Sequence, residues 1–128
     1  MSYYFSKTMN DDFDTVIYKV TEALKKEGFG ILTEIDVQET LKKKLDVDFR
    51  KYKILGACNP HFAHQALLEE PFIGTMLPCN VIVQQYEDGK VEVSAVDPVA
   101  SMMAVQNEKL KAVADEVREK LRNVISNI

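Results

Sequence analysis

The dipeptide Asp88-Gly89, in the second half of the chain, is the feature that most constrains the fold. It separates two predicted strands, 79–87 and 90–96, and Asp-Gly at such a junction is typical of a tight turn between antiparallel strands. Residues 52–58 are apolar enough for an inner strand, and residues 3–8 predict a further strand at the start of the chain.

A fifth strand is expected over residues 29–37, where apolar and polar side chains alternate. Such alternation is typical of a strand with one solvated face. The apolar side is predicted to carry Phe29, Ile31, Ile35 and Val37, and the polar side Glu34 and Asp36.

Two long helices are predicted from apolar residues that recur at three- and four-residue steps. The first follows the capping residues Asn10-Asp11-Asp12, ends at Gly28 and has the apolar stripe Phe13, Val16, Ile17, Val20, Ala23 and Leu24. The second, near the end of the chain, has the stripe Leu110, Val113, Ala114, Val117, Leu121, Val124 and Ile125.

Three shorter helices are predicted from capping signals. Asp36 and Glu39 resemble a capping box that opens a helix through Leu45. Asn59-Pro60 and Asp97-Pro98 each place a capping side chain before a proline at the first helical position. The Asn59 helix must end before Pro71, since the residue before a proline avoids helical angles.

Together these elements predict one α+β domain over residues 1–128, with an antiparallel sheet packed on one face by two long helices and joined by short connecting helices.

The net charge of −4 and a pI near 5.2 argue against binding to nucleic acid or anionic lipid. The first ten residues do not resemble a signal peptide, and no apolar stretch approaches the roughly 20 residues that cross a bilayer. We therefore expect a cytoplasmic protein with reduced thiols and no membrane or nucleic-acid partner.

Residues 52–84 contain both cysteines and both histidines of the chain. Cys58 precedes the predicted start of the Asn59-Pro60 helix, where the positive end of the helix dipole favours a thiolate. His61 and His64 are three residues apart and share a helix face. Cys79 begins a predicted strand and returns beside Cys58 if the two strands are neighbours.

This Cys/His segment allows several interpretations. The cysteines can simply be buried as small hydrophobes. Cys58, His64 and Cys79, with His61 as a weaker fourth ligand, can bind a transition metal such as zinc, although their spacing does not match the common zinc-finger pattern. Cys58 can act as a nucleophile with His64 as its base.

A further interpretation needs no chemistry at these residues: the aromatic side chains, together with Met76, Met102 and Met103, can line an apolar ligand pocket under the helices.

Several short motifs, in order along the chain, resemble the family named domain of unknown function 302. They are Ala57-Cys58-Asn59-Pro60, Ala63-His64, Leu77-Pro78-Cys79-Asn80-Val81 and Val93-Ser94-Ala95-Val96-Asp97-Pro98. The resemblance implies an α+β fold loosely similar to that of the TATA-binding protein, and a homodimer, but neither DNA binding nor any agreed activity. It matches by position the polar residues Cys58, Asn59, His64, Cys79, Asn80 and Asp97; His61 falls outside the pattern.

We interpret the chain first as a small-ligand or metal-binding domain whose contacting groups come from the Cys/His cluster. The alternatives are a thiol-dependent enzyme or redox protein that uses Cys58 and Cys79, and a structural or regulatory dimeric domain without a site.

Overall fold

A computed structural model describes residues 2–128. Its five strands are β1 (Tyr4–Met9), β2 (Gly30–Asp36), β3 (Tyr52–Cys58), β4 (Cys79–Gln85) and β5 (Val91–Val96). They form one sheet in the order β1-β5-β4-β3-β2, and every neighbouring pair is antiparallel. The predicted hairpin is confirmed as β4 and β5, with Gly89 at φ 86°, a left-handed conformation that glycine adopts without strain.

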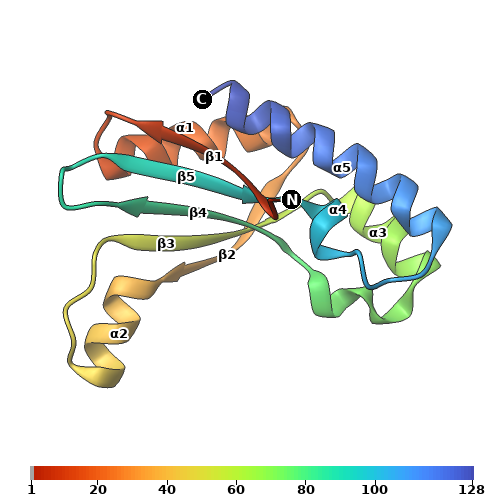
Figure 1. The fold of residues 1–128 in the computed structure, drawn as a ribbon, viewed down its shortest axis with the longest axis horizontal. Helices are drawn as coiled ribbons and strands as arrows, with labels where there is room; N and C mark the ends of the chain where they lie inside the picture. Colours follow the sequence, from red (N-terminus) through yellow and green to blue (C-terminus); the bar gives the residue numbers. More distant parts are fainter. Residues whose placement is uncertain (1) are drawn as a thin grey trace.

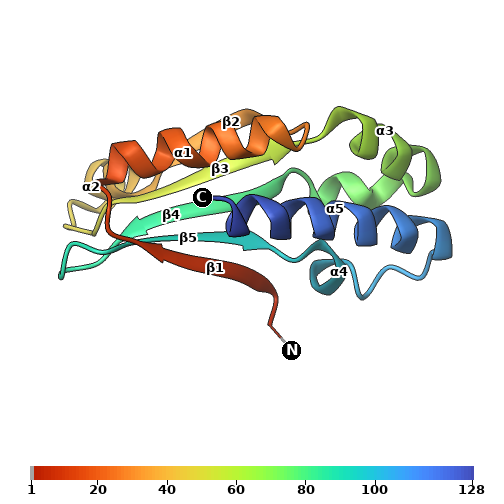
Figure 2. The same cartoon turned by 90° about the horizontal axis from the view of Figure 1, so that it is seen from above.

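The two long helices, α1 (Phe13–Lys26) and α5 (Glu108–Ser126), lie side by side along one face of this sheet (Figures 1 and 2). The predicted α+β arrangement is therefore confirmed. The core forms where the helix stripes meet the inward side chains of the strands, and its most completely buried members include Val16, Val20, Leu24, Leu55, Val81, Val83, Val93 and Leu121.

Strand β2 departs from the predicted alternation. Its pairing with β3 shifts between Ile31 and Thr33, so Ile31 lies opposite buried Ala57 whereas Ile35 lies opposite Ile54 on the other face. A bulge of this kind inserts one residue and reverses every later side chain. The prediction that Ile31 and Ile35 share one apolar face is therefore wrong, and Ile35 is 47% exposed.

The short elements are α2 (Val37–Leu45), α3 (Pro60–Glu69), the 3-10 helix η1 (Pro71–Met76) and α4 (Pro98–Ser101). The capping side chains Asp12, Asp36 and Asp97 each accept a hydrogen bond from a backbone N–H in the first turn of the helix that follows, at 2.8, 2.9 and 3.0 Å respectively. These local predictions are confirmed, because a cap depends only on residues a few positions apart.

A second apolar cluster lies beyond the end of the sheet. Ala66 of α3, Ile73 of η1 and Leu110 of α5 are its buried members. Helix α5 has 19 residues and is therefore about 28 Å long, while the strands it crosses span roughly 20 Å. Its first turns project past the sheet, and α3, η1 and α4 pack around them.

Among the glycines of the chain, Gly56 has the least room for a side chain. A Cβ atom at this position would lie 2.2 Å from Thr33 Oγ1 and 2.8 Å from Pro78 Cγ, whereas one at Gly30 would meet nothing within 4 Å. We expect Gly56→Ala to lower the free energy of unfolding by about 1–3 kcal/mol through overpacking. Urea unfolding measures this loss, with Gly30→Ala as the matched control; equal stability of the two variants would contradict the prediction.

Candidate functional site

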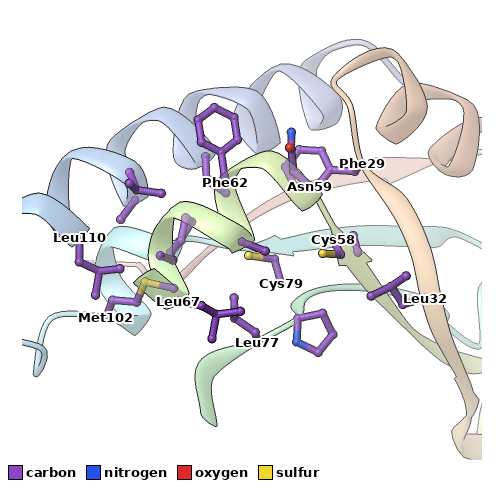
Figure 3. A pocket seen from close by; sticks show the side chains of 18 residues that line it. Phe29, Leu32, Cys58, Asn59, Phe62, Leu67, Leu77, Cys79, Met102 and Leu110 are labelled. Atoms are coloured by element: carbon purple, nitrogen blue, oxygen red, sulfur yellow. The ribbon is translucent and has the colours of Figure 1, made fainter. Parts of the chain in front are cut away.

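A cavity of about 280 Å³ lies at the junction of the two apolar clusters, between the end of the sheet, α3 and α5 (Figure 3). Strand β3 contributes Ala57 and Cys58 to its wall, and β4 contributes Cys79. Most of the other lining side chains are apolar, and they include Phe29, Phe62, Leu77, Pro98, Met102, Leu110 and Val117. The cavity opens to solvent where Leu32 and Leu67, both exposed, line its rim.

Both cysteines reach this cavity as free thiols. Ala57 pairs directly with Cys79, so Cys58 and Cys79 lie at adjacent ends of two neighbouring strands. Cys79 is buried and Cys58 is partly exposed. Burial disfavours the charged form and raises the pKa of the Cys79 thiol to about 11, and nearby Cys58 adds to the shift. Cys79 is therefore a neutral thiol at physiological pH.

Asn59 lines the same cavity, but it does not cap α3 as predicted. Its side chain makes no capping hydrogen bond; instead Nδ2 donates to the backbone carbonyl of Glu27, at 3.2 Å. Glu27 is the C-cap residue of α1, and the last carbonyls at the end of a helix lack partners within the helix. Asn59 thus satisfies one of these carbonyls and ties the start of α3 to the end of α1, which fixes one wall of the cavity.

The two histidines lie elsewhere. His61 and His64 are exposed on α3, neither lines the cavity, and the His61 ring packs edge-on against Phe62 at a centroid distance of 5.2 Å. Within residues 2–128, no three His, Cys, Asp or Glu side chains lie close enough together to bind a metal ion. The structure therefore brings Cys58 and Cys79 together but does not add His64 to them, and no hydrogen bond in the described chain joins Cys58 to His64 as base.

The last two predicted polar residues also lie outside the cavity. Asn80 follows Cys79 in β4 and is exposed on the opposite face of the sheet. Asp97 is only 1% exposed and forms an ion pair with Arg118 of α5, at 3.3 Å between Oδ2 and the guanidinium. Asp97 thus fixes α4 against α5, and neighbouring Pro98 lines the cavity.

The family model described as "Domain of unknown function DUF302" matches residues 5–128. The chain belongs to this family. It is similar to the crystal structure of an uncharacterized conserved DUF302 protein from Bacillus stearothermophilus, with 27% sequence identity, a TM-score of 0.91 and coverage of 99% of this chain and 98% of that one. No curated protein matches the chain. Among the described residues, no helix combines the length and the apolar character that a membrane span requires.

Most of the lining of this DUF302 cavity could not be distinguished from core by sequence. Of the three methionines predicted to line a pocket, Met102 does so, whereas Met76 and Met103 are exposed. The sequence does not distinguish Leu77, Leu110 and Val113 as site residues, because an apolar residue at helical spacing or near a strand has the same pattern whether it contacts a neighbour or lines a cavity. The signals in the sequence were the two cysteines and Asn59 beside the ends of two predicted strands, together with Met102.

The raised pKa of Cys79 makes stability depend on pH in the alkaline range. Between about pH 9 and 11 the folded state keeps the thiol proton that the unfolded chain has lost, so the free energy of unfolding falls as pH rises. We expect Cys79 to account for about 2 kcal/mol of loss between about pH 8 and 10.5. Urea unfolding at several pH values should show a shallower decline for Cys79→Ala than for the wild-type protein.

Cys58→Ala is the matched control, since it removes the partly exposed thiol and should keep most of the alkaline decline. Equal slopes for Cys79→Ala and the wild-type protein would contradict burial as the cause of the raised pKa.

Proposed function

We propose that this protein binds a small, uncharged and largely apolar molecule in the cavity between α3, α5 and the sheet end. The observation that supports the proposal is the character of the lining: within the described residues it contains no Lys, Arg, His, Asp or Glu side chain. A charged group buried there would lose its hydration without gaining a partner, which costs several kcal/mol. The buried part of the ligand is therefore neutral.

The volume limits the size of the ligand. At about 280 Å³ the cavity has roughly twice the volume of an apolar cavity that holds benzene. A molecule of about ten non-hydrogen atoms fits this space, and the exposed rim at Leu32 and Leu67 gives it a route of entry. A short alkyl chain or a bicyclic aromatic ring has this size and character.

The few polar groups of the wall define how such a ligand is oriented. The Cys79 thiol is neutral and therefore a weak donor, and the partly exposed Cys58 thiol lies beside it. Asn59 donates a hydrogen bond from Nδ2 to the backbone carbonyl of Glu27. Its Oδ1 is left to accept a hydrogen bond from a hydroxyl or N–H group of the ligand. A ligand with one donor on an apolar body satisfies these groups.

The metal-binding and thiol-enzyme alternatives have less support in this geometry. A metal requires deprotonated thiolates, and the raised pKa of Cys79 opposes this. A Cys58 nucleophile requires a base, and His64 is exposed on α3 outside the cavity. We further propose that the protein acts in the cytoplasm as a homodimer, the assembly that its family resemblance implies.

The absence of charge in the lining predicts selectivity between two probes of equal length. We expect 1-octanol to bind and octanoate to bind at least roughly tenfold more weakly, because burying the carboxylate is unfavourable. Isothermal titration calorimetry and the ligand-induced rise in melting temperature measure both affinities. Binding of octanoate as tight as that of 1-octanol would contradict a cavity for neutral ligands.

Filling the cavity provides the direct test of the site. Ala63 of α3 lines the cavity, and Ala63→Leu places three further carbon atoms in the ligand space. We expect this variant to stay folded and to lose binding of 1-octanol by roughly tenfold or more. Ala112→Leu, at an exposed position of α5, is the matched control and should bind as the wild-type protein does.

Chemical-shift changes in methyl groups of the wild-type protein locate the probe. Changes confined to Leu77, Leu110 and Val113 support binding in the cavity; unchanged binding by Ala63→Leu would overturn the proposal.

A further inference from the structure

The face of the sheet opposite α1 and α5 has an unusual composition for a surface in contact with water. In Figure 1 no helix of the described chain covers this face of β4 and β5. The strand register assigns to it Tyr4, Ser6, Thr8, Thr33, Ile35, Tyr52, Ile54, Gly56, Asn80, Ile82, Gln84, Glu92, Ser94 and Val96. We call this set the open face. Among these residues only Glu92 carries a charge.

The carboxylate of Glu92 already has hydrogen-bond partners within the chain. Its carboxylate accepts hydrogen bonds from Ser6 Oγ at 2.7 Å and from Tyr86 Oη at 2.6 Å. Arg50 brings one positive charge nearby: its guanidinium lies 5.8 Å from the Tyr86 ring centroid, and its Nε donates to Gln84 Oε1 at 2.9 Å. The open face with Arg50 is therefore neutral overall, although the chain carries a net charge of −4.

Aromatic side chains surround the polar centre of this face. Four of the five tyrosines of the chain line a hollow of about 460 Å³ there, namely Tyr3, Tyr4, Tyr52 and Tyr86. Gln84, at its centre, is only 8% exposed even though no helix of the described chain covers it. Depletion of charge and enrichment of tyrosine around amide and hydroxyl groups distinguish the centres of protein–protein interfaces from ordinary surface.

We propose that the open face is the surface through which two copies of this chain associate. A strongly charged partner would require the opposite charge here, and the open face is neutral. A two-fold axis presents each side chain to the same surface of its partner, and the side chains of Asn80, Gln84 and Ser94 can both donate and accept hydrogen bonds. One surface can therefore complement itself.

The size of the face is sufficient for such a pairing. Five strands about 4.8 Å apart, each about six residues long, give a face of roughly 24 by 20 Å. Two copies packed sheet against sheet would bury roughly 1,000 Å² in total, which reaches the lower limit for a specific interface. This inference rests on the proposed homodimer and is independent of ligand binding in the cavity.

The test is the mass of the protein in solution, measured by sedimentation velocity over a range of micromolar concentrations. We expect the wild-type protein to sediment at twice the chain mass of 14.5 kDa. Ile82→Glu, at the centre of the open face, should weaken dimerisation by roughly tenfold or more, because it buries an unpaired charge. Tyr4→Glu, at the exposed edge of the same face, should act in the same direction without affecting the fold.

Tyr18→Glu is the matched control: it introduces the same charge at a 66% exposed position of α1, on the helical side of the molecule. Circular dichroism confirms that each variant is folded. A monomeric wild-type protein would overturn the homodimer itself. A wild-type dimer that Tyr18→Glu dissociates and the two open-face variants do not would retain the homodimer and move its interface to the helices.

Discussion

Helix α5 is longer than the sheet it covers, and the rest of the molecule is arranged around that mismatch. Its second half places Val117, Leu121 and Val124 in the core cluster beside the strands, while its first turns, with Leu110, extend past the strand ends. The part of an apolar helix stripe that extends beyond the sheet must be buried by other elements of the fold. Here α3, α4 and the 3-10 helix η1 bury it. The cavity lies between these short helices and the end of the sheet.

Local interactions made much of the fold predictable. The caps at Asp12, Asp36 and Asp97 and the Asp88-Gly89 turn each depend on residues a few positions apart, so their sequence patterns were sufficient. Asn59 has the same capping pattern but donates to Glu27, a residue 32 positions away. The bulge in β2 likewise depends on its pairing with β3. Features set by tertiary partners are not encoded in a local pattern.

The candidate site likewise combines features that the local sequence predicts with features that depend on tertiary packing. Cys58 ends one predicted strand and Cys79 begins another, so the sequence places them together on the condition that these strands are neighbours. The structure meets this condition, since β3 pairs with β4. His64 could not be placed, since residues three apart share a helix face but the pattern does not say which way that face points. Helix α3 turns buried Phe62 and Ala66 toward the cavity, which leaves His61 and His64 on its outer surface.

Strand β4 joins the two surfaces that this fold presents. Successive side chains of a strand point to opposite faces. Cys79 therefore lines the cavity, whereas Asn80, the next residue, lies on the open face. A ligand against Cys79 and a partner against Asn80 would therefore contact the same strand end. Because the buried Val81 and Val83 hold the rest of β4 in the core, a ligand in the cavity could influence a partner on the open face most directly through the backbone at residues 79 and 80.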